Sequence, residues 1–211
     1  MAQLRAERTR SSIVETAARA FAEFGYDGIS LNELVEATGM SKGAFYFHFS
    51  SKEGVALAAF RAKQKQMVGL LSAGEPRPTA TDQLAWSLRR RAQLFVEDPS
   101  LRCVIRLGTD LGARSGPGSE FSSFIELAVA AWVNLLRRGI ASGEFRRDLD
   151  PEATALAIFS WVVGMDSLSL LQSDAKDLAD RTEDMIDLLV PALSVSAPPK
   201  RSKVGAKRGG L

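Results

Sequence analysis

The sequence has one cysteine and one histidine among its 211 residues, and this scarcity excludes several kinds of site. Cys103 alone cannot form an intramolecular disulfide, and together with His48 it cannot supply the ligands of a zinc site. Any catalytic triad or histidine-based acid and base would have to be built around His48. We therefore expect no metal and no cofactor, and we interpret Cys103 as a small buried apolar side chain.

Long apolar runs are also missing. The longest charge-free apolar stretch, Ala153 to Met165, is shorter than the roughly 18 residues that a membrane-spanning helix needs. The N-terminal segment MAQLRAERTR is charged and lacks the apolar core of a secretory signal. We expect no transmembrane span and a cytoplasmic location.

The 27 basic and 25 acidic side chains nearly balance, but they are distributed unevenly along the chain. Basic residues are in excess in residues 1–66 and 196–211, and acidic residues are in excess in residues 67–195. The last segment is too polar to fold alone, so it is predicted to be a basic disordered tail. It is either a solvated remnant or a source of nonspecific DNA affinity.

Apolar residues recur at spacings of three and four through the rest of the chain, and Gly or Pro interrupts the pattern at intervals. This periodicity predicts an all-α protein of about nine helices. The expected helices cover residues 5–24, 31–37, 41–47, 52–71, 82–96, 99–111, 119–141, 151–171 and 178–193.

Helix start signals are concentrated between residues 30 and 53. Ser30 and Glu33 have the spacing of a capping box, and so do Ser50 and Glu53 before a long helix. Ser41 is the N-cap of a further short helix. Two short helices joined by a turn that contains Gly have the outline of a helix-turn-helix.

The segment that begins at Ser41 has residue types that suit a helix in the DNA major groove. Lys42 is a long donor beside small residues such as Gly43, which allow the backbone to approach base edges. Phe45 and Tyr46 offer a flat contact to a thymine methyl, or a hydroxyl contact to a phosphate. The candidate DNA-binding residues are Ser30, Ser41, Lys42, Gly43, Phe45, Tyr46, His48 and Lys52, with Arg5 and Arg8 as an N-terminal arm.

Structural alternatives remain open for several of these residues. We interpret Phe47 and Phe49 as core residues and Phe45 as exposed. Tyr46 could instead pack between helices, and His48 could only cap a helix C-terminus. Arg5, Arg8 and Arg10 form either a solvated face or a contact to the DNA backbone or minor groove.

The chain has a Gly25-Tyr26 pair, an L-x-E-L-x-x-x-x-G run from Leu31 and a K-G-x-x-Y-x-H-F-x-S-K-E run from Lys42. In this order they resemble the DNA-binding signature of the TetR family of bacterial transcriptional regulators, over about residues 8 to 60. The resemblance implies a homodimer on double-stranded operator DNA, with no enzymatic activity. It also implies a helix-turn-helix DNA-binding domain in residues 1–50 and a helical effector-binding and dimerisation domain in residues 51–195, whose first helix is a linker.

Within that family, the segment from Leu101 to Gly112 and its spacing to FRRDLDPE are similar to γ-butyrolactone autoregulator receptors of actinomycetes. The Trp that those receptors place against the lactone would fall near Ala128, whereas this chain has Trp132 one helical turn later. A γ-butyrolactone is therefore one candidate effector, and other hydrophobic molecules remain open.

The eighth expected helix carries a stripe that includes small residues, which would allow a second helix to approach closely. With apolar positions of the ninth helix, this stripe predicts a four-helix dimer interface, and the alternative is the core of one chain. The stripe consists of Ala153, Ala157, Ser160, Trp161, Gly164 and Leu168, and the ninth helix adds Leu178, Met185, Leu188 and Leu189.

An effector pocket is expected between the fifth and eighth helices, with plain core packing as the alternative for each residue. Its candidate lining is Trp86, Phe95, Leu107, Phe124, Trp132, Phe159 and Val163.

The reading that these features favour is a repressor released from a palindromic operator by a small hydrophobic effector. A small enzyme is a competing hypothesis, and it would need pocket-facing carboxylates such as Asp110 and Asp166 because no histidine lies in the C-terminal half. A protein-binding adaptor that uses the apolar C-terminal helices and never binds DNA is the third.

Overall fold

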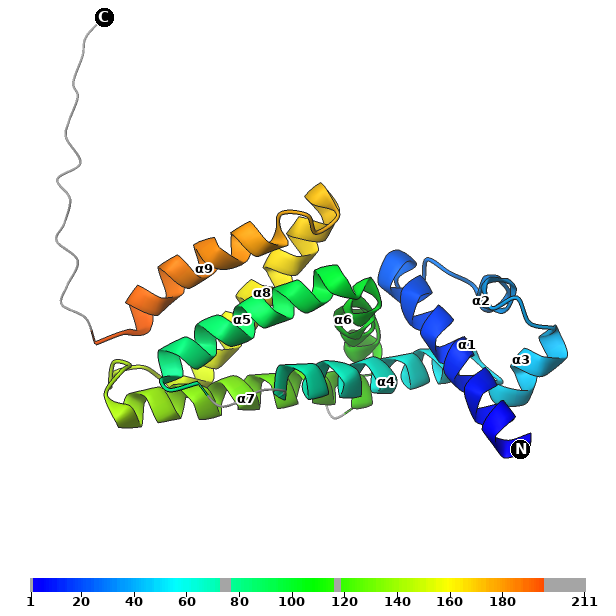
Figure 1. The fold of residues 1–211 in the computed structure, drawn as a ribbon, viewed down its shortest axis with the longest axis horizontal. Coiled ribbons are helices and arrows are strands. Elements are labelled where there is room, and N and C mark those ends of the chain that lie inside the picture. The colour runs from blue at the N-terminus through cyan, green and yellow to red at the C-terminus, as the bar shows by residue number, and fades with distance from the viewer. Residues whose placement is uncertain (1, 73–76, 116–118, 196–211) are drawn as a thin grey trace, which may run out of the picture.

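The computed structural model describes residues 2–72, 77–115 and 119–195, except for the side chains of residues 2, 70–72 and 124. The predicted basic tail lies outside the described residues. Within them the chain forms nine α-helices and a short 3-10 helix (Figure 1). The helices are α1 (Ala2–Phe24), α2 (Leu31–Ala37), α3 (Lys42–His48), α4 (Lys52–Ser72), α5 (Ala80–Glu97), η1 (Pro99–Arg102), α6 (Cys103–Ser115), α7 (Glu120–Ser142), α8 (Pro151–Ser173) and α9 (Leu178–Leu193).

The all-α prediction is confirmed, and the short helices begin where side chains cap them. In the α2 capping box the Ser30 amide donates to Glu33 Oε2 at 2.7 Å, and the Glu33 amide donates to Ser30 Oγ at 3.2 Å. Ser41 Oγ accepts from the Ala44 amide at 3.2 Å at the start of α3. The expected box at Ser50 is wrong, because Ser51 caps α4 by accepting from the Gly54 amide at 3.1 Å.

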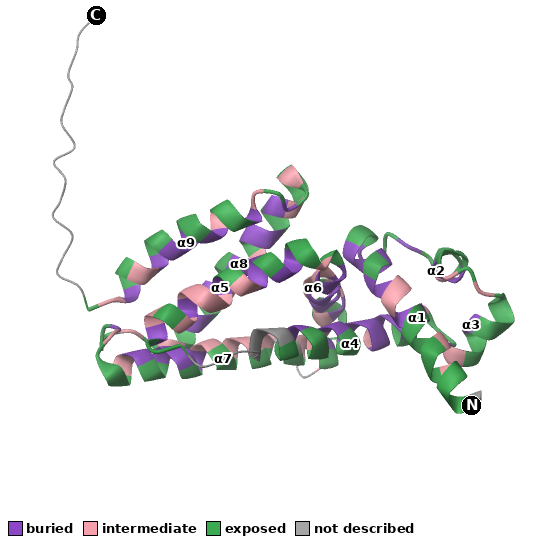
Figure 2. Ribbon diagram, viewed as in Figure 1, coloured by how far each residue is buried: buried purple, intermediate pink, exposed green. Residues whose placement is uncertain are grey.

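Helices α1, α2 and α3 form one end of the molecule, and α4 leads from them into the bundle of α5 to α9 (Figure 1). The faces that the helices turn toward one another carry most of the buried residues (Figure 2). Phe21 and Phe45 are fully buried at the N-terminal end, and Leu84, Leu107 and Leu136 are fully buried in the bundle. Helices α1 and α4 pack against each other and both pack against α6, and burial of apolar side chains stabilises this packing.

A buried lysine adds a polar contact between α1, α4 and the start of η1. Lys63 is 3% exposed and lies 2.8 Å from Glu15 Oε2 and 3.5 Å from Asp98 Oδ2. The Asp98 carboxylate also accepts from the side-chain amide of Gln66, with Nε2 at 2.9 Å from Oδ2. Burial alone would raise the pKa of Asp98, but hydrogen bonds from Ser100 and Gln66 and the charge of Lys63 hold it below the usual value.

Within the described residues, α8 is the one helix long and apolar enough by length and composition to cross a membrane. The charge-free stretch from Ala153 to Met165 ends just before Asp166. In the structure α8 continues past this residue and buries it in an ion pair with Arg91. Core helices of soluble proteins pass the same length and composition test, and α8 packs along α7. Its apolar character is therefore weak evidence for a membrane span.

Candidate functional site

The outward face of α3 presents the first turn of the expected recognition helix to solvent. Ser41, Lys42 and Gly43 are all exposed, and a Cβ at Gly43 would meet no atom within 4 Å. Tyr46 is 43% exposed and Phe47 is 80% exposed. A long cation, an open backbone position and two rings therefore share a surface that can approach a groove.

The expected roles of Phe45 and Phe47 are reversed in the structure. Phe45 is fully buried and its ring centroid lies 6.2 Å from that of Phe49, which is also buried. Residues two apart on a helix point to nearly opposite sides, so burying Phe45 turns Phe47 outward. Phe45 is therefore a core residue that orients α3, and Phe47 joins the exposed surface.

Three further candidates lie around this surface in supporting contacts. Ser30 is exposed, and its hydroxyl takes part in the α2 capping box. Lys52 is half-buried, with its ammonium 4.2 Å from the centroid of the Tyr26 ring. His48 is half-buried in the last turn of α3. The structure thus gives Ser30 and Lys52 structural contacts at the edge of the exposed face.

The N-terminal arginines lie on a helix, because α1 already begins at Ala2. Arg5, Arg8 and Arg10 are exposed. The Arg10 guanidinium lies 5.0 Å from the centroid of the Phe49 ring, which places this part of α1 beside the end of α3. The predicted helical placement of these arginines is confirmed, and they form a basic edge next to α3 that is open to a DNA contact.

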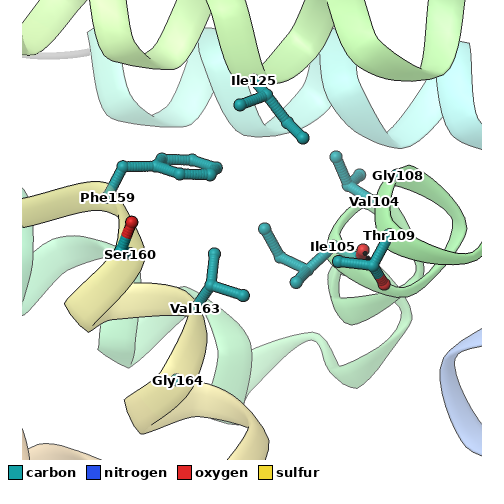
Figure 3. Close-up of a pocket in the computed structure, with 9 residues that line it drawn as sticks. All are labelled: Val104, Ile105, Gly108, Thr109, Ile125, Phe159, Ser160, Val163 and Gly164. Atoms are coloured by element: carbon teal, nitrogen blue, oxygen red, sulfur yellow. Dashed lines mark hydrogen bonds between the residues drawn. The ribbon is translucent and has the colours of Figure 1, made fainter. Parts of the chain in front are cut away.

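An apolar pocket of about 370 Å³ lies between α6, α7 and α8 (Figure 3). Side chains from all three helices point into it, and its walls are almost free of polar atoms. The size and apolar lining suit a small hydrophobic molecule. The lining residues are Val104, Ile105, Gly108, Thr109, Ile125, Phe159, Ser160, Val163 and Gly164.

Of the predicted lining, Phe159 and Val163 do face this pocket. Leu107 is fully buried in the core, because it lies on the other side of α6 from Ile105 and Thr109. Phe95 lines a separate cavity of about 40 Å³.

The two predicted tryptophans do not line the pocket either. Trp86 is half-buried beneath Arg77, whose guanidinium lies 4.9 Å from its ring centroid. Trp132 is half-buried and packs against the core. The side chain of Phe124 lies outside the described residues. Sequence reasoning missed the α6 wall, although apolar and small residues at 104, 105, 108 and 109 follow helical spacing.

The pocket wall α6 also contacts the end of α1. Arg106 Nη1 donates to the carbonyl oxygens of Ala22 and Glu23 at 3.0 and 2.7 Å. The Tyr26 amide donates to Asp110 Oδ2 at 3.1 Å. One helix thus carries pocket-lining residues and residues that hold the end of α1, next to the helix-turn-helix.

Comparison with known proteins bears directly on this arrangement. Residues 13–59 match the model of the family described as bacterial regulatory proteins, TetR family. The crystal structure of full-length TylP, a TetR regulator from Streptomyces fradiae, is 31% identical, with 90% of this chain and 89% of that chain covered and a TM-score of 0.70. The chain belongs to the TetR family.

Two further TetR-like relatives bear signal-receptor names. The A-factor receptor protein of Streptomyces griseus is 29% identical over 91% of this chain, and the chain spans 66% of that relative's length. The crystal structure of a γ-butyrolactone receptor described as ArpA-like is 26% identical, with 86% of this chain and 99% of that chain covered and a TM-score of 0.64. The chain is therefore a TetR-family transcriptional regulator similar to these receptors.

The expected dimer stripe is exposed on α8 of this TetR-family chain. Ala153, Ala157, Ser160, Trp161, Gly164 and Leu168 are all exposed. On α9, Leu188 is 65% exposed and is available to a partner, whereas the expected place in the interface is wrong for Leu178, Met185 and Leu189, which are buried. The last three pack inside the chain, since α9 lies against α5 and α8.

The two carboxylates considered for catalysis are held in separate contacts. Asp110 accepts from the backbone of Tyr26, and Asp166 is buried against Arg91, whose Nη1 lies 2.5 Å from Asp166 Oδ2. No group of three or more potential metal ligands occurs within the described part of the chain. The members of the matching family are described as regulatory proteins, and neither carboxylate lines the apolar pocket.

Proposed function

We propose that the protein is a dimeric cytoplasmic repressor that leaves a palindromic operator when a small hydrophobic effector occupies the pocket between α6, α7 and α8. The observation that carries this proposal is the double role of α6. Ile105 and Gly108 line the pocket, while Arg106 and Asp110 hold the end of α1. An effector that repositions α6 would therefore act on the DNA-binding end.

The DNA-reading surface in this proposal is the exposed face of α3 with its basic edge. Lys42 reaches a base edge or phosphate, and the Tyr46 hydroxyl reaches a phosphate oxygen. Arg5 and Arg8 contact the backbone from the neighbouring turns of α1. Ser41 and Gly43 allow close approach, while His48, Lys52 and Ser30 support the edge of the same surface.

The second copy pairs through the exposed faces of α8 and α9. The stripe around Gly164 lets two helices approach closely, and Trp161 and Leu168 supply apolar area. In a two-fold dimer the two α3 helices would enter major grooves about 34 to 36 Å apart, which matches half-sites one turn apart. Residues 1–50 are then the DNA-binding unit, and residues 51–195, with α4 as linker, hold the effector and the partner.

Effector binding would lower operator affinity by selecting one of two conformations. A ligand shifts such an equilibrium only by its differential affinity for the two states. The pocket provides such a difference in affinity if the ligand fits the conformation with α6 displaced better than the DNA-bound conformation. No chemical step is needed, in keeping with a non-enzymatic regulator.

The proposal is tested by selecting bound sequences from random duplex DNA and then titrating small molecules against the selected complex. We expect a palindromic operator bound by two copies and released by at least one hydrophobic compound. Val163→Phe, which fills the pocket, should keep operator affinity and lose release. If the protein binds no duplex DNA even at low salt, the DNA-binding role is contradicted. The protein-binding adaptor would then be the hypothesis to pursue.

A γ-butyrolactone is a second, finer candidate for the effector, supported by the similarity to the ArpA-like receptor. Trp132 does not line the pocket, so the lactone would rest on Phe159 and the aliphatic walls instead. Tryptophan fluorescence across a lactone series tests this through Trp132 of α7 and Trp161 of α8, which belong to helices that line the pocket. Unchanged emission and unchanged operator affinity with every lactone at high concentration would remove this candidate.

A further inference from the structure

A buried ion pair lies beside the apolar pocket and is incompletely hydrogen-bonded. Arg91 is 7% exposed and Asp166 is 9% exposed, and Arg91 Nη1 lies 2.5 Å from Asp166 Oδ2. Within the described residues, Arg91 Nε, Arg91 Nη2 and Asp166 Oδ1 are buried without a hydrogen-bond partner. Buried polar atoms are nearly always paired, because leaving them unpaired costs free energy. These three atoms therefore indicate a place for a polar group.

Asp166 lines a small cavity of about 40 Å³ together with Phe95, Ile105, Ser167 and two further arginines, Arg102 and Arg106. The Arg91 guanidinium lies 5.3 Å from the centroid of the Phe95 ring, so the pair and this wall are in contact. A cavity of this size holds a water molecule or the hydroxymethyl end of a ligand.

The small cavity is separate from the apolar pocket, but the two share one wall residue. Ile105 lines both, and on α8 Val163 of the pocket is followed at helical spacing by Asp166 and Ser167 of the cavity. The same two helices, α6 and α8, thus supply an apolar chamber and, one turn further along α8, a polar end.

We propose that the Arg91–Asp166 pair is the polar end of the effector site and recognises a hydroxyl group on an otherwise apolar ligand. A hydroxyl is the smallest group that can donate to Asp166 Oδ1 and accept from Arg91 at once. An ether could accept from Arg91 but could not donate to Asp166 Oδ1. This inference rests on the proposed effector pocket, and it specifies the chemical class of the effector as an apolar molecule with a hydroxyl group.

Burial also explains why the pair would respond to such a ligand. Burial raises the pKa of Asp166 despite the opposing charge and hydrogen bond of Arg91 and the charge of Arg102. A ligand donor would therefore stabilise the ionised carboxylate, whose solvation by water has been lost.

The test compares 1-octanol with 1-methoxyoctane, an ether of similar shape that accepts a hydrogen bond but donates none. Binding to the full chain is measured by calorimetry and by saturation-transfer NMR. We expect octanol to bind about tenfold more tightly, since hydrogen bonds to charged groups are the stronger ones. Val163→Phe should weaken both probes, because it fills the chamber that holds their chains.

Two variants test the pair itself. Arg91→Met with Asp166→Leu replaces it by apolar groups, a change that buried ion pairs often tolerate without loss of stability. Asp166→Asn keeps the shape and presents an amide that donates to alcohol and ether alike. In both variants the preference for octanol over methoxyoctane should disappear, and thermal unfolding reports whether each variant is folded.

Equal binding of the two probes to the native chain would overturn the inference, and so would an unchanged preference in either folded variant or the absence of binding by both probes. Equal binding leaves the apolar pocket in place and removes only its polar end. Failure of the DNA-binding proposal would appear separately, in the operator selection.

Discussion

Two surfaces of this protein expose large apolar side chains, and their charged neighbours are opposite in sign. On α3, Tyr46 and Phe47 lie beside Lys42 and near the arginines of α1. On α8, Trp161 and Leu168 share a pocket with Asp184 and Arg181 of α9, and Asp180 and Asp187 are exposed on the same helix, which leaves an acidic excess. Phosphates attract the first surface and are repelled by the second. Exposed apolar area marks a binding face, and the surrounding charge indicates whether DNA or protein binds it.

The largest change is expected from a charge placed on the α8 surface. Leu168→Asp should convert the dimer to monomers and lower operator affinity by about a hundredfold or more, because two linked reading helices gain on the order of 10²–10⁴ in avidity. Sedimentation and gel shifts measure both effects. Leu127→Asp on α7 is a matched control, since Leu127 is 52% exposed and Leu168 is 50% exposed. A dimeric Leu168→Asp variant would contradict the pairing through α8.

A second comparison separates the two phenylalanines of α3. Phe45→Ala should lower the free energy of unfolding by about 3 kcal/mol, because it empties a fully buried site. Phe47→Ala should leave stability within about 0.5 kcal/mol and weaken DNA binding instead. Urea unfolding measures the stability of both variants, and gel shifts measure their DNA binding. Together they show whether one substitution lowers stability and the other lowers DNA affinity. Equal destabilisation by the two substitutions would count against the packing of α3.

A smaller effect is expected from the polar groups on the same surface. Lys42→Ala should weaken specific operator binding by about 1–3 kcal/mol if it reads a base, with relaxed preference at one position. Tyr46→Phe should weaken binding by about 1 kcal/mol on every sequence, because only a phosphate contact is lost. Gel shifts at matched salt measure both, with Lys65→Ala on α4 as the control. Full affinity in the Tyr46 variant would remove its hydroxyl from the interface.

An effect of similar size is expected at the buried contact that joins α1, α4 and the start of η1. Lys63→Met should lower stability by about 1–2 kcal/mol at neutral pH, because the Lys63 contacts to Glu15 and Asp98 are lost. The folded-state pKa of Asp98 is lowered, so its contribution is present above the unfolded pKa and is lost as pH falls through the folded value.

The difference in stability between native and variant should therefore shrink below about pH 4, near the ordinary pKa of an aspartate carboxyl. Urea unfolding between neutral and acidic pH measures this difference. A constant difference across that range would show that the ion pairs contribute nothing.

Local signals predicted most of the fold, because caps and periodicity act within a few residues. The bounds of α2 and α9 match the prediction, and Ser30 and Ser41 cap their helices as expected. The exposed stripe of α8 was likewise visible in its spacing.

What the sequence could not supply was the direction in which a short helix turns. Helix α3 has seven residues, too few for periodicity to choose between Phe45 and Phe47, and its packing on Phe49 decides. The pocket depends on three helices meeting, so Ile105 and Ile125 become neighbours of Phe159 only after folding. The unpaired atoms of Arg91 and Asp166 are visible only once burial is known.

The division of labour on α6 bears on how new ligand responses could arise in this scaffold. Arg106 and Asp110 of this helix bind the end of α1 and alternate with the pocket-lining residues, so substitutions in α6 would alter signal transmission and ligand choice together. The opposite walls of the pocket are formed by Phe159, Val163 and Ile125, and among the described residues none of these three contacts the end of α1 through a hydrogen bond. Engineers who wish to retune a biosensor built on this chain should begin with those walls and leave α6 unchanged.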